Sequence, residues 1–407
     1  MNKNCDAKDN RWLHRFAVLT AAATFLLLGL GGLVTSNEAG MSVPDWPTSY
    51  GYNMFALPIK FWKGGAFFEH SHRLLASAVG FLTTILAVWI WLKDSRKWMK
   101  WLALAAFLGV VAQGVLGGLR VTMKMDSLGI FHGVIAQTFF VLTCAIALFT
   151  SGCWQKISEQ KLNVPRGLQN LVLATTVLIF LQLILGATMR GQHAGLAIPD
   201  FPTAYGQIWP DTSADAVARY NAKSTNPNTI TAFQINLQMI HRIVAIVILS
   251  SVAFCALWKK RLDKFEASKV ASAWIQNLRL VIGVFLAVQL VVFVGAAIYF
   301  GELNNAALMF VGPVYLITCA LFTVISFLSS EIALGWLGLI LLQIGLGMAT
   351  IWTNKAADVA TAHVLVGALS LVTGALWCII AFGRSAEMPE TETAPFGAFG
   401  TFATNKQ

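Results

Sequence analysis

Long apolar stretches alternate with short polar segments along the whole 407-residue chain. Each stretch is long enough to cross a bilayer as a helix, which needs roughly 20 apolar residues. The ten stretches lie near residues 15–36, 73–92, 99–119, 130–150, 168–189, 239–258, 278–300, 305–328, 332–351 and 362–383. The pattern therefore predicts an all-α fold, a polytopic transmembrane helical bundle of about ten spans.

The composition supports a membrane protein. Hydrophobic residues make up 57% of the chain and charged residues 12%, whereas a soluble domain has roughly 25% charged residues. This excludes an ordinary water-soluble enzyme. The net charge of +10 gathers in short loops between apolar stretches, so it indicates orientation in the bilayer and not a nucleic-acid partner.

The positively charged loops alternate with loops that are poor in lysine and arginine. The amino-terminal tail and the segments 93–100, 156–166 and 259–269 are basic. The positive-inside rule places these segments and both termini in the cytoplasm. The two longest loops, about 37–71 and 191–237, are then expected outside.

These two long loops contain an internal repeat. Residues 39–51 and 194–206 match at eight of thirteen positions, in the pattern A-G-x-x-x-P-D-x-P-T-x-Y-G. A generic turn explains proline, aspartate and glycine singly, but not this order twice after an apolar helix. The repeat predicts two related four-helix units, one in residues 1–160 and one in 161–407, with an inserted two-helix hairpin at about 277–329.

Four histidines follow the same repeat. His72 corresponds to His241, and His132 corresponds to His363. The second pair is separated by 62 more residues than the first, which is about the length of two spans with their connections. Because two additional spans are an even number, we expect all four histidines on the same side of the membrane.

The positions of these histidines suggest heme ligation. Each is expected near the first turn of a helix that enters from outside, so the imidazoles would lie at similar depth. Two facing imidazoles in a four-helix bundle can hold a heme iron between helices. A single histidine at such a position is as often an interfacial residue, but recurrence in both halves favours one bis-histidine site per half. Zinc is less favoured, since the sequence offers no fitting cluster of further ligands.

Neighbouring charged residues add candidate roles. Arg73 and Arg242 directly follow the ligands, where each guanidinium is either a partner for a heme propionate or a positively charged interfacial anchor. Glu69 lies one helical turn before His72, whereas Gln238 takes the same place before His241. A carboxylate exchanges protons and an amide does not, so Glu69 is the candidate catalytic residue. The alternative is a helix-start carboxylate stabilised by the macrodipole.

Two further histidines, His70 and His193, have no counterpart in the other half. We therefore expect them at the outer surface.

Together these residues resemble the heme A synthase family. The resemblance rests on Gly31-Gly32-Leu33-Val34-Thr35, the repeated loop, Glu69-His70-Ser71-His72-Arg73, Phe131-His132-Gly133 and their second-half partners. It implies an oxidoreductase that oxidises a ring methyl of heme O to a formyl group, giving heme A for cytochrome oxidase. The family pattern assigns the substrate heme to His72 and His132 with Glu69, and a resident heme b to His241 and His363, beside which Arg242 is the candidate cofactor-binding residue.

The resemblance also implies a location and partners. It indicates an integral protein of the bacterial cytoplasmic membrane, with the heme sites near the outer face. Heme O synthase, cytochrome oxidase assembly factors and an electron acceptor are candidate partners besides heme O and the lipid bilayer. The inserted hairpin departs from the eight spans typical of the family, and the outer-loop cysteine pair of some members is missing from this sequence.

Two other functions compete with this interpretation. A diheme membrane cytochrome that relays electrons, for example from quinol, also needs four axial histidines, but it gives no reason for glutamate in one half and glutamine in the other. A transporter built from repeats predicts polar residues near mid-membrane. The ionisable residues of this chain gather instead near the predicted outer edge.

Overall fold

The computed structural model describes residues 11–152, 154, 164–223, 229–266, 323 and 331–383. This part of the chain contains eight helices long and apolar enough to cross a membrane. They are α1 (Arg11–Ser36), α2 (Gly65–Lys93), α3 (Lys97–Thr122), α4 (Asp126–Phe149), α6 (Arg166–Gly191), α8 (Ala232–Glu266), α11 (Ile332–Trp352) and α12 (Ala357–Phe382). The predicted all-α, polytopic class is confirmed, and the chain is an integral membrane protein.

Eight of the ten predicted spans correspond to these helices. The other two, 278–300 and 305–328, lie outside the described residues, as does nearly all of the predicted hairpin at about 277–329. The division into units 1–160 and 161–407 stays a prediction.

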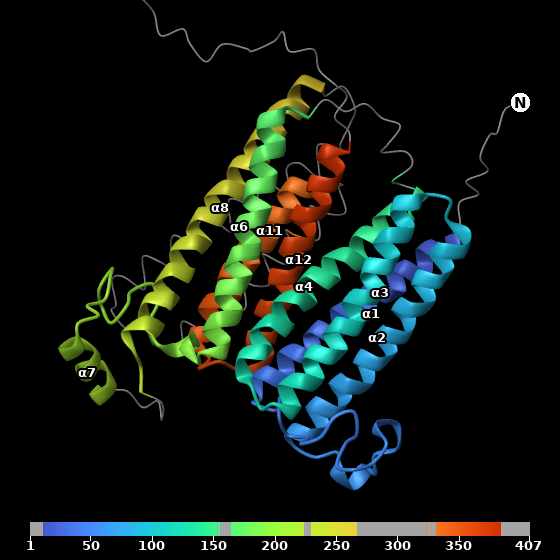
Figure 1. Ribbon diagram of the computed structural model, residues 1–407. Helices are drawn as coiled ribbons and strands as arrows, with labels where there is room; N and C mark the ends of the chain where they lie inside the picture. The colour runs from blue at the N-terminus through green and yellow to red at the C-terminus, as the bar shows by residue number, and fades with distance from the viewer. Residues whose placement is uncertain are drawn as a thin grey trace, which may run out of the picture.

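The helices form two groups of four that stand side by side (Figure 1). In the first group α1 packs against α2 and α4, and α3 packs against α2 and α4. In the second group α6 and α11 each pack against α8 and α12. Contacts of α12 with α1 and α4, and of α4 with α6, join the two groups, so α4 and α12 lie near the middle of the molecule.

Each group has an apolar core at the end away from the long loops. In the first group Leu86, Ile90 and Met99 are fully buried, and in the second Leu168 and Trp336 are. Large apolar side chains also cover the outside of the helices; examples are Leu26, Phe81, Leu92, Trp101 and Ile246. Such a surface is stable against hydrocarbon and not against water.

Two long loops lie at the opposite end of the bundle, each below its own group of helices, and we call this the loop end (Figure 1). The first long loop (residues 37–64) contains the short 3-10 helices η1 (Met54–Ala56) and η2 (Ile59–Phe61). The second long loop (residues 192–231) contains η3 (Ala194–Leu196) and α7 (Ala214–Lys223).

Each of the two loops contains the same kind of turn, built around an aspartate. The Asp45 carboxylate accepts hydrogen bonds from the backbone N–H groups of Tyr50 (2.6 Å) and Gly51 (2.9 Å). In the second loop Asp200 accepts the equivalent bonds from Tyr205 (2.7 Å) and Gly206 (2.9 Å). The matching sequence pattern thus folds twice into the same local structure.

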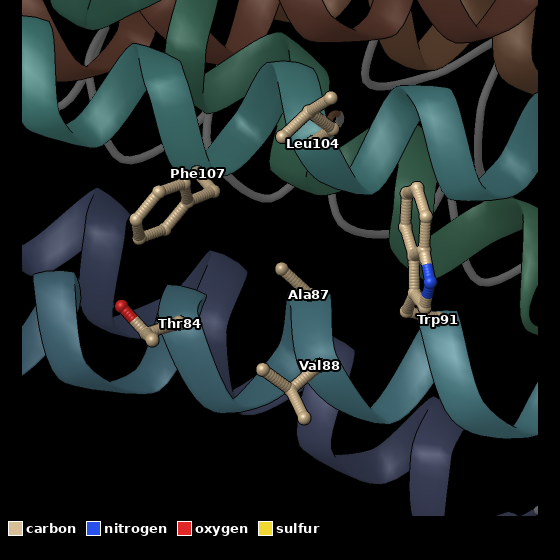
Figure 2. A pocket seen from close by; sticks show the side chains of 6 residues that line it. All are labelled: Thr84, Ala87, Val88, Trp91, Leu104 and Phe107. Atoms are coloured by element: carbon tan, nitrogen blue, oxygen red, sulfur yellow. The ribbon is translucent and has the colours of Figure 1, made fainter.

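A shallow groove runs between α2 and α3 (Figure 2). It is lined by Thr84, Ala87, Val88, Trp91, Leu104 and Phe107. Thr84 follows His72 by twelve residues on the same helix, which corresponds to about 18 Å. The groove therefore lies well away from the histidines, and its lining offers almost no polar group for chemistry.

Candidate functional site

The four predicted ligands lie deeper in their helices than expected. His72 is the eighth residue of α2 and His241 the tenth of α8, while His132 and His363 are each the seventh residue of their helix. With a rise of 1.5 Å per residue, the histidines stand roughly 9 to 14 Å from the helix starts. The expectation of a first-turn position is wrong, because the helices begin before the apolar stretches do.

The start of α2 illustrates the reason. Gly64 precedes the helix with φ of 55° and ψ of −134°, a conformation that L side chains rarely adopt. The helix then runs from Gly65 through Glu69, beneath the first long loop, before its lipid-facing stretch begins. The apolar stretch in the sequence, residues 73–92, therefore covers only the later part of α2.

Each histidine ring packs against a glycine of the preceding helix. An added Cβ would lie 3.2 Å from His72 Cε1 at Gly31 and 3.3 Å from His132 Cε1 at Gly117. In the second group the distances are 3.4 Å from Gly186 to His241 and 3.2 Å from Gly347 to His363. One arrangement, a ring in a glycine cradle, therefore occurs four times.

The cradle also encloses one nitrogen of each ring. The Nδ1 atoms of His72, His132 and His241 are buried without a hydrogen-bond partner, and His363 Nδ1 lies 3.1 Å from the Gln343 carbonyl oxygen. That carbonyl is four residues before the facing glycine. Because Nδ1 is enclosed against the neighbouring helix, Nε2 is the nitrogen left for a metal.

The separation of the first pair fits two ligands of one iron. The ring centroids of His72 and His132 are 6.5 Å apart, and the rings are inclined by 78°. Two imidazoles on one metal have centres roughly 6 Å apart, because each bond is about 2 Å and each centre lies about 1 Å behind its nitrogen. The first half thus has the donor set and spacing for bis-histidine ligation.

The second pair has the same donors with one obstruction. His241 and His363 each face a cradle glycine of the preceding helix, as the first pair does. The side-chain nitrogen of Gln343 lies 3.3 Å from His363 Nε2. This amide would have to turn aside before that nitrogen could bind iron.

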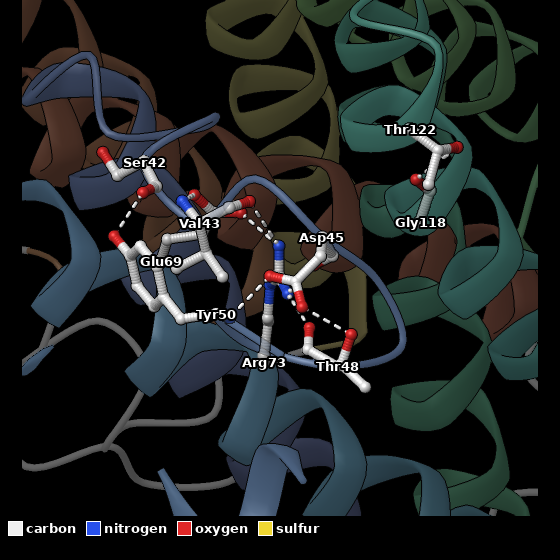
Figure 3. A network of polar contacts seen from close by, with 9 residues as sticks. All are labelled: Ser42, Val43, Asp45, Thr48, Tyr50, Glu69, Arg73, Gly118 and Thr122. Atoms are coloured by element: carbon white, nitrogen blue, oxygen red, sulfur yellow. Dashed lines mark hydrogen bonds and ion pairs between the residues drawn. The ribbon is translucent and has the colours of Figure 1, made fainter. Parts of the chain in front are cut away.

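Glu69 is only 4% exposed and faces the first long loop (Figure 3). Its carboxylate accepts a hydrogen bond from Val43 N–H at 2.9 Å and pairs with Arg73 at 2.7 Å. The Nη groups of Arg73 also donate to the carbonyl oxygens of Val43 (3.1 Å), Asp45 (2.6 Å) and Thr48 (3.1 Å). The pair holds the loop against α2, and all four Nη–H groups of Arg73 are used.

The second half repeats this contact without a carboxylate. Gln238 accepts a hydrogen bond from Ile198 N–H at 2.7 Å, and Arg242 donates to the carbonyl oxygens of Asp200 (2.7 Å) and Thr203 (2.9 Å). Arg242 differs from Arg73 in that its Nε is buried without a partner. The propionate roles of both arginines stay predictions, and Arg242 retains a free donor for one.

The structure corrects the position of one of the two unmatched histidines. His70 is 1% exposed, so its expected place at the outer surface is wrong. Its ring meets Trp62 edge-on, with 4.7 Å between centroids, because the first long loop folds over this side of α2. His193 is exposed, as expected, and has a left-handed backbone with φ of 52°.

The repeat in the sequence aligns Gln113 and Gly117 with Gln343 and Gly347, but sequence reasoning missed Gln182. Gln182 donates to the His241 carbonyl oxygen at 2.8 Å, and Gln113 donates to that of His132 at 3.3 Å. The signal was present, since glutamine precedes the cradle glycine by four residues in α3, α6 and α11.

Two arginines were missed as well. Arg120 and Arg190 lie in the last turns of α3 and α6, at the loop end of the bundle. Arg190 also donates to the Gly32 carbonyl oxygen of α1 at 2.8 Å, so it ties the two helix groups together. Neither arginine recurs at the matching position of the other half, and the repeat therefore did not reveal them.

Apolar spanning helices that carry two histidine pairs near one end define a polytopic membrane protein with two candidate bis-histidine centres. The sequence model of a family described as cytochrome oxidase assembly protein matches residues 14–299. The chain belongs to this family. The matched range includes His72, His132 and His241.

Curated relatives agree with the family. The chain is 28% identical over 218 residues to the heme A synthase of Halalkalibacterium halodurans, covering 52% of this chain and 70% of that protein. It is 25% identical over 298 residues to the heme A synthase of Alkalihalophilus pseudofirmus, covering 71% and 90%. For the heme A synthase of Bacillus cereus the identity is 26% over 320 residues, covering 76% and 92%.

Proposed function

We propose that this protein is a heme A synthase, an oxidoreductase that converts heme O to heme A by oxidising a ring methyl group to a formyl group. The family membership and the curated relatives support this activity. The observation that carries the proposal is the spacing of 6.5 Å between the His72 and His132 rings beside a buried carboxylate that the other half lacks.

The substrate heme is assigned to the first half. His72 and His132 would bind its iron through Nε2, and the glycine cradles would fix the orientation of both rings. Glu69 is the proposed group that would hold or accept a proton near the ring edge. In the structure its carboxylate is bound to Arg73 and Val43, so a catalytic role requires that the loop contact loosen or that the proton move through it.

The second half is assigned to a resident heme b held by His241 and His363, with Arg242 as the candidate propionate partner. A bis-histidine heme would supply one-electron transfer there. Gln238 has no acidic proton to exchange at physiological pH, which is consistent with a half that binds a cofactor and carries out no proton chemistry.

Orientation is part of the proposal. We place the loop end outside a bacterial cytoplasmic membrane and both termini in the cytoplasm. Basic residues support this. Arg11 and Arg15 lie in the first turns of α1, and Lys93, Arg96 and Lys97 lie where α2 ends and α3 begins, away from the long loops.

The test is to extract and chromatograph hemes from cells that make heme O, with and without this protein. The proposal expects heme A to appear only when the protein is present. A protein that binds heme b with a bis-histidine spectrum but yields no heme A would instead be an electron-relaying diheme cytochrome.

A further inference from the structure

Arg120 is a positively charged residue beside the first histidine pair. It lies in the last turn of α3, three residues after the cradle glycine Gly117, whose added Cβ would be 3.3 Å from His132 Cε1. Its guanidinium fits between the first long loop and α4. A Cβ on Gly40 would come within 2.6 Å of Nη1, and a Cβ on Gly129 within 3.0 Å of Nε. A side chain at either position would displace the guanidinium from this place.

The hydrogen-bonding capacity of Arg120 is largely unused. Its ion pair within the described part of the chain is with Asp126, at 3.5 Å, and the Asp126 side chain is 69% exposed. The Nε of Arg120 is buried without a partner. Buried donors are nearly always satisfied, and a guanidinium is best satisfied by a carboxylate that accepts two parallel hydrogen bonds.

Arg73, the arginine next to His72 in sequence, has no Nη–H group left for a ligand. All four Nη–H groups of Arg73 are taken by Glu69 and three loop carbonyls. The second half has no equivalent of Arg120, since the matching residue, counted from Gly347, is Thr350, whose hydroxyl donates to the Leu346 carbonyl oxygen at 2.8 Å. A guanidinium three residues after the cradle glycine is therefore specific to the half that contains Glu69.

We propose that Arg120 binds a carboxylate of the ligand in the first half, namely a propionate of the substrate heme. This inference rests on the proposed function, because it requires a heme between His72 and His132. Arg120 would be a positioning residue that fixes the rotation of the macrocycle and thereby selects the ring edge presented to Glu69.

The test compares two probes, ferric heme b and its dimethyl ester, whose propionates carry no charge. The full-length protein is titrated with each, and the first-half component is defined as the bis-histidine absorbance that His72→Ala removes. Arg120→Gln is expected to weaken free-acid binding about 10- to 100-fold, the range of a charge-assisted hydrogen bond. Binding of the diester should change little, and Arg120→Lys should recover part of the free-acid affinity.

A matched control removes a nearby charge that faces solvent. Lys124 is exposed just after α3, and Lys124→Gln should leave the affinities for both probes unchanged. An unaltered second-half spectrum in Arg120→Gln establishes that the variant is folded.

The possible failures are distinguishable. Equal weakening for acid and diester, or no weakening, overturns the role of Arg120 and leaves the proposed function intact. If the wild-type protein has no component that depends on His72, the assignment of the first half to heme fails, and the inference fails with it.

Discussion

Glu69 and Gln238 bind the same backbone position of the two long loops. Glu69 accepts a hydrogen bond from Val43 N–H at 2.9 Å, and Gln238 accepts one from Ile198 N–H at 2.7 Å. An amide is therefore sufficient to hold the loop. The negative charge of Glu69 is an additional feature, balanced in the structure by Arg73 at 2.7 Å, and a purely structural explanation of Glu69 does not require it.

This comparison makes Glu69→Gln the informative variant. The glutamine should retain the contact with Val43, as Gln238 does with Ile198, so the protein should fold and keep its resident heme. Conversion of heme O should fall at least about 100-fold, the lower range for loss of a general acid or base. Heme chromatography measures the conversion, and the reduced-minus-oxidised spectrum measures the resident heme.

Glu69→Ala is the control for a structural role. It removes the charge beside Arg73, as Glu69→Gln does, and in addition the acceptor for Val43 N–H and for Arg73, which together should lower the free energy of unfolding by about 3 to 5 kcal/mol. Glu69→Gln should be less destabilised in the same denaturation experiment, because its amide oxygen can still accept a hydrogen bond. If heme A output is normal in Glu69→Gln and reduced only in Glu69→Ala, Glu69 serves the fold alone.

The glycine cradles predict a second set of variants. Gly117→Ala places a methyl group 3.3 Å from His132 Cε1, which tilts the ring from its rotamer and should weaken first-half heme binding by up to about tenfold. Gly114→Ala is the matched control on the same helix, because a Cβ there meets nothing within 4 Å. Heme titration distinguishes them, and equal affinities would show that the cradle does not position the ligand.

The two histidine pairs should separate by spectroscopy. His241→Ala and His363→Ala should each abolish the resident heme signal in a reduced-minus-oxidised spectrum, because bis-histidine ligation needs both rings. His72→Ala and His132→Ala should keep that signal and lose heme O binding. A normal bis-histidine spectrum in both second-half variants would contradict the assignment.

The first long loop should loosen in acid. Burial opposes the charge of Asp45, but hydrogen bonds from Thr48, Gly51 and Tyr50 outweigh it and hold the pKa below the usual 3.8. A carboxyl group with a lowered pKa stabilises the folded loop above its unfolded pKa, and this contribution is lost as pH falls through the folded pKa. Hydrogen-exchange protection of the Tyr50 and Gly51 amides should therefore decline below about pH 4.

Asp45→Asn provides the control for this titration. The amide can accept fewer of the same bonds, so protection should already be reduced at neutral pH and should lose its acid dependence. If the wild-type loop keeps full hydrogen-exchange protection down to pH 2, the ionised Asp45 carboxylate does not stabilise the loop.

Topology can be tested with single cysteines. Phe55 in the first long loop is 72% exposed, and Ser95 is exposed between α2 and α3. On intact cells a membrane-impermeant maleimide should label Phe55→Cys and not Ser95→Cys, with the parent protein as background. Labelling of Ser95→Cys alone would reverse the proposed orientation.

Local and periodic features were predictable from sequence. The eight helices of the described chain and the matching turns at Asp45 and Asp200 followed from patterns within one segment. The four histidines were found because the repeat aligned them. Features that depend on packing between segments were harder to find: His70 is buried because Trp62, in the loop before its helix, folds over it, and no property of its own helix indicates this.

The sequence by itself determined that the chain spans a membrane, that its loops are duplicated and which four imidazoles are the candidate ligands, because hydrophobicity and repeats are encoded along the chain. Tertiary structure decided that glycines of neighbouring helices seat the rings, that Glu69 and Arg73 hold a loop, and that Arg120 lies beside the first pair. These relationships depend on how helices far apart in sequence pack, and that packing fixes distances and burial that no single segment contains.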